Sequence, residues 1–288
     1  MFGQNEIVGL KYFKDAPPDS LMVTSRFYTL QGEGPYRGEP AYFIRLTKCN
    51  LACSFCDTFF DAGEYKTYEE LFTESDKVIE EFYRTRNLDT PDWAQGLDKK
   101  IGLVITGGEP TLQSNLVEFL NQAKKYFKWC QIESNGILAR PLGEHVTYVV
   151  SPKCLEKDHK AVKYLEPNPM MLERASCLKF VMSADQDSPY SKVPDWALDW
   201  REKTGKPIFI SPMNIYNKMP EKAKNLRASG QNDISIKERS TVDEIISAWE
   251  PGLLDMVKNQ ANHQYTAEYC MKIGATFQMQ VHLWANLA

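Results

Sequence analysis

Short apolar runs recur along this chain between longer helical or polar stretches. Their lengths suit buried strands, and they lie at residues 41–46, 101–106, 131–133 with the residues just before, 146–150, 178–182, 207–210 and 277–282. Helix-like spacing of apolar residues predicts helices over 68–86 and 115–127. The alternation is typical of an α/β protein with a largely parallel sheet.

Nearly all of these predicted strands run into residues suited to chemistry. Five such clusters follow the strands: Lys48-Cys49, Thr106 to Pro110, Glu133 to Gly136, Ser151 to Lys153, and Ser211 to Asn214. In α/β sheets and barrels, ligands bind at the carboxyl ends of the strands. We therefore expect the five clusters to meet at one mouth.

The 288 residues contain no internal repeat and no linker rich in Pro, Gly or Ser, so a single domain over 1–288 is the simplest organisation. A polar run at 221–238 and an amphipathic segment at 242–249 predict an inserted loop and helix within 217–262, suited to a lid or an interface.

Charge and hydropathy exclude some classes of function. The net charge is −4, and the Lys and Arg residues are scattered rather than gathered in a stripe, which argues against nucleic-acid binding. No apolar run approaches the ~20 residues that span a bilayer, and the first residues do not resemble a signal peptide. We expect a cytoplasmic protein without a membrane partner.

Three of the seven cysteines lie within eight residues: Cys49, Cys53 and Cys56 form a C-x3-C-x2-C pattern. An odd number of cysteines in a chain of this length does not indicate a disulfide framework. The other four, Cys130, Cys154, Cys177 and Cys270, are dispersed and are expected to be small buried core residues.

The three clustered thiolates point to a metal centre held by a loop. Structural zinc and cubane iron-sulfur sites usually take four protein ligands, and only three are local here. Either a distant residue such as Cys154 or His282 completes the set, or one iron is left open for a substrate or cofactor.

The C-x3-C-x2-C pattern, with Phe55 before its last cysteine, resembles the cluster loop of the radical S-adenosylmethionine (SAM) superfamily. The resemblance implies that Cys49, Cys53 and Cys56 are the catalytic cysteines and hold three irons of a 4Fe-4S cluster, while SAM chelates the fourth. The segment 106–110 resembles the superfamily's SAM-binding turn, where glycines would let the backbone approach the methionyl group.

Further segments at 27–34, 41–46 and 49–58 resemble the 7-carboxy-7-deazaguanine synthase family. The resemblance continues at 107–110, 133–136, 151–153 and 280–282, with divergent insertions near 61–100, 155–176 and 215–265. It implies a partial (β/α) barrel of the radical SAM type and a homodimer.

The implied activity is the ring contraction of 6-carboxy-5,6,7,8-tetrahydropterin to 7-carboxy-7-deazaguanine with loss of ammonia, in 7-deazapurine (queuosine) biosynthesis. The implied cofactors are the 4Fe-4S cluster, SAM and Mg²⁺, and a reductant such as flavodoxin is the expected partner.

The resemblance also assigns roles to individual residues. It places SAM against Phe55, Cys56, Asp57, Gly108, Glu109, Ser134, Ser151, Pro152, Lys153, Ser211, Pro212, Met213 and Asn214. It places the pterin against Leu30, Gln31, Gly32, Glu33, Arg45, Thr106 and Ala288, and Mg²⁺ against Thr58. The family often has Gln where Ser211 stands and Pro where Ala288 stands.

Residue chemistry supports several of these roles. Arg45 lies in an apolar strand and needs a partner, either the bidentate carboxylate of a substrate or a structural ion pair. Gln31 and Glu33 suit the amide-like edge and amino group of a pterin, or form a polar turn. The Thr58 hydroxyl suits Mg²⁺ or a helix cap.

Two other functions fit part of the pattern. A glycyl-radical-enzyme activase, such as that of anaerobic ribonucleotide reductase, would share the cluster loop but gives no reason for 31–34, 151–153 and 280–282. A non-catalytic iron-sulfur or zinc binding module would need a fourth protein ligand.

Overall fold

The computed structural model describes residues 6–158, 160–216, 255–281 and 287. A nine-stranded sheet forms its centre, in the order β11-β10-β9-β6-β5-β4-β2-β1-β3. The strands are β1 (Ser20–Leu30), β2 (Pro40–Leu46), β3 (Glu64–Thr67), β4 (Lys99–Gly107), β5 (Phe127–Ser134), β6 (Val146–Val150), β9 (Cys177–Met182), β10 (Ile208–Pro212) and β11 (Thr276–Phe277). Pairing is parallel from β2 to β11, and only β1 and β3 join as antiparallel strands.

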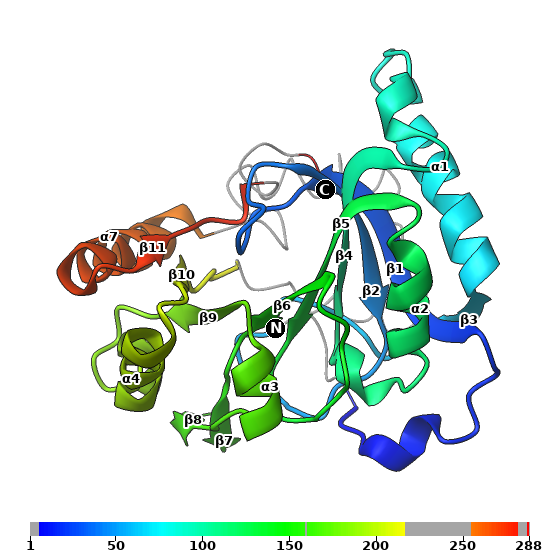
Figure 1. Cartoon of the computed structure of the whole chain (residues 1–288). Coiled ribbons are helices and arrows are strands. Elements are labelled where there is room, and N and C mark those ends of the chain that lie inside the picture. The colour runs from blue at the N-terminus through cyan, green and yellow to red at the C-terminus, as the bar shows by residue number, and fades with distance from the viewer. Residues whose placement is uncertain (1–5, 159, 217–254, 282–286, 288) are drawn as a thin grey trace, which may run out of the picture.

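Helices flank this sheet at both ends (Figure 1). They are α1 (Tyr68–Arg84), α2 (Leu116–Ala123), α3 (Pro169–Arg174), α4 (Asp195–Thr204) and α7 (Met256–Ile273), with short 3₁₀ turns at Leu10–Phe13, Asp92–Ala94, Pro110–Leu112 and Pro189–Ser191. Helix α1 begins at a capping box, in which the Thr67 hydroxyl accepts from the Glu70 N–H and the Glu70 carboxylate accepts from the Thr67 N–H. Its Phe72 ring stacks on Phe119 of α2, so the apolar faces of both helices join the core beside the sheet.

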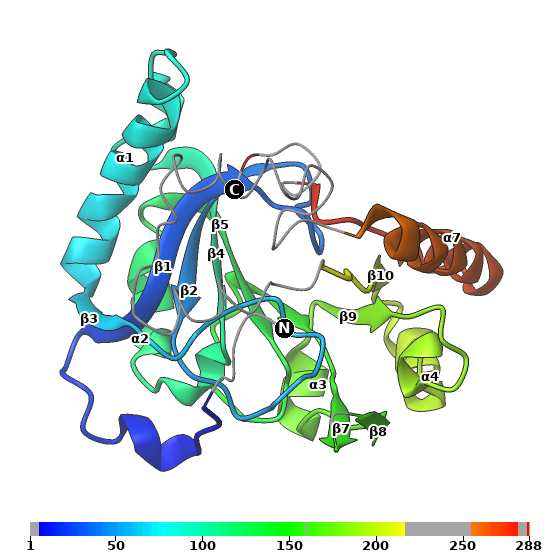
Figure 2. The same ribbon diagram turned by 180° about the vertical axis from the view of Figure 1, so that it is seen from behind.

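A separate antiparallel hairpin, β7 (Cys154–Lys157) and β8 (Lys160–Tyr164), follows β6. Figure 2 shows the light-blue loop between β2 and β3 crossing the sheet toward this hairpin. The loop carries the three clustered cysteines, so the hairpin and the loop come together although they lie about a hundred positions apart in the sequence, as the contact of Ser54 with Glu156 demonstrates.

The predicted strands are confirmed, with two adjustments to the elements. The last run, 277–282, contributes only the strand Thr276–Phe277; the Gln278 N–H still donates to the Ile210 carbonyl over 3.0 Å, and its side chain bonds Gly34 and Ser211 in the polar interior. The helix predicted over 115–127 ends at Ala123, because β5 already begins at Phe127. The segments expected at 221–238 and 242–249 lie outside the described residues.

Four strands and three helices of the described residues had no counterpart in the expected elements: β1, β3, β7, β8, α3, α4 and most of α7. The dispersed cysteines are buried as expected. No described helix is long and apolar enough to cross a membrane.

Candidate active site

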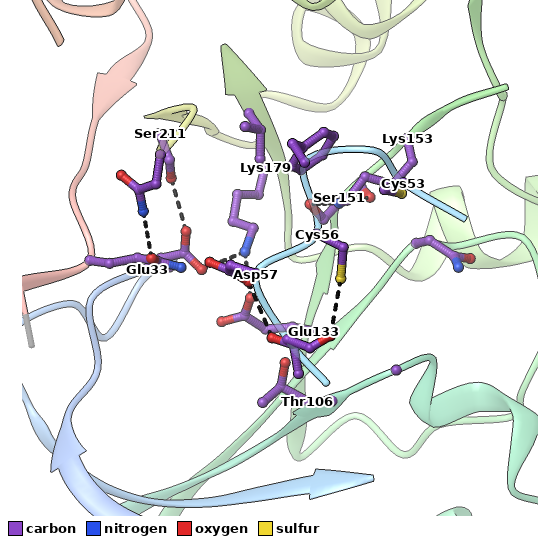
Figure 3. A pocket seen from close by; sticks show the side chains of 18 of the residues that line it. Glu33, Cys53, Cys56, Asp57, Thr106, Glu133, Ser151, Lys153, Lys179 and Ser211 are labelled. Atoms are coloured by element: carbon purple, nitrogen blue, oxygen red, sulfur yellow. Dashed lines mark hydrogen bonds and ion pairs between the residues drawn. The ribbon is translucent and has the colours of Figure 1, made fainter. Parts of the chain in front are cut away.

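All five polar strand ends open into one cavity of about 660 Å³ (Figure 3). Each cluster supplies at least one lining residue: Cys49 after β2, Thr106 to Glu109 after β4, Glu133 to Asn135 after β5, Ser151 and Lys153 after β6, and Ser211, Pro212 and Asn214 after β10. The predicted convergence is confirmed, because parallel strands bring their carboxyl ends to the same edge of the sheet.

The three clustered cysteines all line this cavity. The Cys56 N–H donates to the Cys53 carbonyl over 3.1 Å, which closes a tight turn between these two thiols. Burial raises the pKa of the Cys49 and Cys53 thiols to about 12. The cavity lining therefore offers three sulfur donors. A bound metal would replace the protons of these thiols.

The donor set suits a cluster better than a single ion. No group of three or more Cys, His, Asp or Glu side chains within the described ranges is close enough to hold one metal ion. In an iron-sulfur cubane, by contrast, each thiolate binds a different iron. Cys154, one candidate for a fourth ligand, is buried in β7 and does not line the cavity, and His282 lies outside the described residues.

Gly107 and Gly108 let the end of β4 pack closely against neighbouring backbone. A Cβ on Gly108 would lie 1.8 Å from the Lys48 carbonyl oxygen, and one on Gly107 would lie 2.3 Å from the Leu46 backbone. The Glu109 N–H donates to that Lys48 carbonyl over 2.8 Å. Both glycines therefore make room for the backbone where β2 runs into the cluster loop, and both also line the cavity, so the contact of Gly108 with SAM stays a prediction.

Glu109 ties the ends of β4 and β5 together. Its buried carboxylate accepts hydrogen bonds from Thr111, Ser134 and the Asn135 N–H. The Asn135 amide then donates to Asn50 over 2.8 Å, inside the cluster loop. The side chain of Glu109 is thus occupied in holding the frame around the cysteines.

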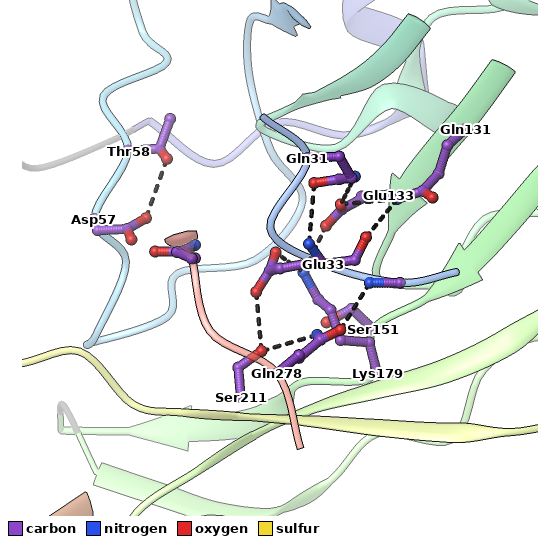
Figure 4. A network of polar contacts seen from close by, with 12 residues as sticks. Gln31, Glu33, Asp57, Thr58, Gln131, Glu133, Ser151, Lys179, Ser211 and Gln278 are labelled. Atoms are coloured by element: carbon purple, nitrogen blue, oxygen red, sulfur yellow. Dashed lines mark hydrogen bonds and ion pairs between the residues drawn. The ribbon is translucent and has the colours of Figure 1, made fainter. Parts of the chain in front are cut away.

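Lys179 lies at the centre of a second network, built from β9, β5 and the segment after β1 (Figure 4). Its ammonium is 2.5 Å from both Glu33 and Glu133. Gln31 and Gln131 donate to the Glu133 carboxylate, and Ser211 donates to Glu33 over 3.0 Å. Burial alone would lower the pKa of Lys179, but the two carboxylates outweigh burial and raise it.

Arg45 projects into the same cavity from β2, beside Thr106 of β4. Its Nη1 donates to the Thr58 hydroxyl over 3.3 Å, and its guanidinium lies 5.0 Å from the Phe27 ring centroid. Its Nε is buried without a hydrogen-bond partner, and no carboxylate of the described residues forms an ion pair with it. A structural ion pair, one of the two expectations, is therefore absent among these residues.

Oxygen atoms gather at the end of the cluster loop. The Thr58 hydroxyl donates to Asp57 over 3.2 Å, and the Tyr216 hydroxyl donates to the other Asp57 oxygen over 3.2 Å. On another part of the lining, Lys153 donates to the Ser151 carbonyl and hydroxyl. Burial and then the charge of Lys179 lower the pKa of Lys153.

The chain is similar in sequence to several known proteins. It is 30% identical over 223 residues to the 7-carboxy-7-deazaguanine synthase of Rhodospirillum rubrum, across 74% of this chain and 82% of that protein. The chain belongs to the 7-carboxy-7-deazaguanine synthase family. The synthases of Rickettsia prowazekii (32% identical over 198 residues, 69% of this chain and 75% of that protein) and Bacteroides thetaiotaomicron (40% over 134 residues, 46% and 60%) are further relatives. No family model matches.

A solved structure, QueE from Escherichia coli, superposes with a TM-score of 0.52 at 22% identity and covers 96% of this chain and 99% of that one. This likeness confirms the expected α/β fold of the radical SAM type. Membership of the 7-carboxy-7-deazaguanine synthase family also confirms the resemblance seen in the sequence, and neither the activase nor the binding module is favoured.

Most of the residues that the family resemblance singled out line the cavity. Beyond those already described, they include Phe55 of the cluster loop. Leu30, Gly32, Pro152 and Met213 do not line it, and Ala288 lies outside the described residues. Gly32 instead packs under the C-terminal segment, because a Cβ there would lie 2.8 Å from the Gln280 Cα.

Three polar lining residues were not expected: Lys179, Tyr216 and His263. Lys179 carried a usable signal, since it interrupts an apolar strand in the same way as Arg45 does. Tyr216 and His263 carried no such signal, because they directly flank the segment 217–262, in which the sequence pattern is weak.

Proposed function

We propose that this chain is a radical SAM enzyme that converts 6-carboxy-5,6,7,8-tetrahydropterin to 7-carboxy-7-deazaguanine with loss of ammonia. The observation that carries the proposal is the joining of three elements in one cavity: the three-thiol loop, the buried Lys179 network and the Arg45 guanidinium. Family membership supports the same activity.

Cys49, Cys53 and Cys56 would hold the 4Fe-4S cluster, with SAM on the open iron. When bound, the cluster supplies the electron that cleaves SAM to a deoxyadenosyl radical. The residues around the loop, Asp57, Ser151 and Lys153 among them, offer a carboxylate, a hydroxyl and an ammonium to the polar groups of SAM.

The substrate has two polar ends, and the cavity offers a match for each. A fork of guanidinium donors suits the 6-carboxylate, and Arg45 has a buried Nε without a partner. The amino group and ring amide of a pterin donate hydrogen bonds, and carboxylates only accept them. The ion pairs with Lys179 fix Glu33 and Glu133 in position for that edge.

Magnesium belongs to the proposal through Thr58 and Asp57. Their side-chain oxygens lie 3.2 Å apart and can serve as hard donors, while substrate oxygens and water complete the octahedron that Mg²⁺ requires. The nearby Arg45 adds positive charge, so an anionic substrate carboxylate between the two cations would be needed for stable binding.

The proposed reaction needs a one-electron reductant such as flavodoxin. A homodimer in the cytoplasm is the corresponding assembly and location, and the single domain over 1–288 belongs to the same proposal.

The test is anaerobic reconstitution with iron and sulfide, followed by incubation with SAM, dithionite, Mg²⁺ and the pterin, with 7-carboxy-7-deazaguanine detected by mass. We expect product from the wild type and none from Cys53→Ala. Cleavage of SAM to 5′-deoxyadenosine without deazaguanine would leave the radical chemistry in place and overturn the pterin assignment.

A further inference from the structure

Glu156 holds the cluster loop from outside the cavity lining. One of its carboxylate oxygens accepts from the Ser54 N–H over 2.8 Å, and the other accepts from the Ser54 hydroxyl over 3.2 Å. Ser54 lies between Cys53 and Cys56, inside the tight turn of the loop. A single carboxylate thus fixes both the backbone and the side chain of the residue that separates two of the thiols.

The hairpin that presents Glu156 is itself anchored. The Cys154 N–H donates to the Tyr190 hydroxyl over 2.8 Å, and the Leu165 N–H donates to the Lys153 carbonyl over 2.9 Å. The Tyr190 ring meets Phe55 of the cluster loop edge-on, with 5.0 Å between the centroids. Glu156 therefore acts from a fixed strand rather than from a free loop.

The rest of the loop is held in another way. Cys49 is held through its backbone, since the Val8 N–H donates to the Cys49 carbonyl over 2.9 Å. At the turn between Cys53 and Cys56, the described contact from another element that uses a charged group is the one from Glu156. The position of the turn therefore depends on a side chain that could be changed without altering the backbone.

The carboxylate of Glu156 also places a negative charge next to Cys53. Its two carboxylate oxygens bind the N–H and the hydroxyl of Ser54, the residue directly after Cys53. Lys153, a residue of opposite charge that lines the cavity with Cys53, lies three positions before Glu156 on the same segment. Removal of the carboxylate would leave the Lys153 ammonium unopposed.

We propose that Glu156 is a positioning residue of the iron-sulfur site, which fixes the turn between Cys53 and Cys56 and places a negative charge beside Cys53. The inference rests on the proposed function, since it requires that the loop hold a cluster. Hydrogen bonding and net charge around a cluster set its reduction potential, so this charge disfavours the added electron and lowers the potential.

The experiment compares wild type with Glu156→Gln and the matched control Asp158→Asn. Asp158 is an exposed carboxylate on the same hairpin, so the control makes the same charge change away from the loop. Each protein is reconstituted with iron and sulfide, and three quantities are measured: iron retained against a chelator, the midpoint potential followed by electron paramagnetic resonance, and the melting temperature without iron.

For Glu156→Gln, we expect iron retention to fall about tenfold, the lower end of the range for residues that orient metal ligands. We also expect the potential to rise and the melting temperature of the iron-free protein to stay unchanged. Asp158→Asn should match wild type in all three. Wild-type retention and potential in Glu156→Gln would overturn the inference while leaving the proposed function intact.

A wild-type protein that assembles no cluster would instead overturn the proposed function, and the inference with it. If Glu156→Gln lowers the melting temperature, Ser54→Ala decides the matter, because it removes only the hydroxyl hydrogen bond and leaves the backbone one. A smaller loss of iron retention in Ser54→Ala supports the inference, and wild-type retention contradicts it.

Discussion

The cluster loop and the Lys179 network contribute to the same cavity in different ways. The loop is held largely through its backbone: Gly107 and Gly108 let it approach β4, and the Val8 and Glu109 N–H groups donate to its carbonyls. The network is held by side-chain charge, with Lys179 between Glu33 and Glu133. Changes of shape should therefore damage the cluster loop, and changes of charge should damage the Lys179 network.

The largest effect is expected for Lys179→Met, which leaves two buried carboxylates without their cation. The free energy of unfolding should fall by about 3–5 kcal/mol, measured by urea denaturation at neutral pH. The exposed Lys203→Met is the control and should change little. A loss below about 1 kcal/mol would show that charge does not hold this side of the cavity together.

The contribution of Lys179 to the free energy of unfolding has a defined pH dependence. The folded-state pKa of Lys179 is raised, against burial, by its two carboxylates. Its contribution is therefore fully present below the unfolded lysine pKa of about 10.4, and is lost only as pH rises through the higher folded value. The stability gap between wild type and Lys179→Met should thus not shrink through deprotonation of Lys179 up to about pH 10.

Gly108→Ala tests the close packing of the cluster-loop backbone against the end of β4. Its Cβ would collide with the Lys48 carbonyl, so the loop must shift, at a cost of about 1–3 kcal/mol, and iron binding should fall sharply. Gly9→Ala, where a Cβ meets nothing within 4 Å, is the control for iron content and stability. Normal iron content in Gly108→Ala would refute the close packing of the loop on β4.

Arg45→Lys keeps the charge and removes the planar fork. A lost hydrogen bond to a charged group is worth about 1.5–3 kcal/mol, so KM for the pterin should rise roughly tenfold or more. The apparent affinity for SAM, measured in parallel, should stay near that of wild type. An unchanged KM for the pterin would remove Arg45 from substrate binding.

The smallest effect is expected for Thr58→Val, which preserves shape and removes one oxygen donor. The Mg²⁺ concentration that gives half-maximal activity should rise about fivefold, as expected for the loss of about 1 kcal/mol. Activity that does not respond to Mg²⁺ in either protein would exclude the proposed ion site.

Much of the cavity could be predicted from local sequence. The convergence of Cys49, Thr106, Glu133, Ser151 and Ser211 follows from strand order alone, because parallel strands end at one edge. The cysteine spacing and a charged residue within an apolar strand are also local signals, and Arg45 was found in this way.

What could not be predicted depends on pairings between distant segments. Lys179 has its meaning only beside Glu33 and Glu133, which are 146 and 46 positions away. Glycine is needed at position 108 because the Lys48 backbone lies against it. The contact of Glu156 with Ser54 requires the β7–β8 hairpin, which the apolar pattern of the sequence did not predict. Such contacts depend on tertiary packing, which local pattern does not encode.

An anaerobic crystal structure of the reconstituted protein with SAM and the pterin bound, with iron located by its anomalous scattering, would show directly where the cluster and the substrate lie. The account predicts iron at Cys49, Cys53 and Cys56, and the pterin between Arg45 and the two carboxylates on Lys179. Iron at other residues, or a pterin outside this cavity, would contradict it.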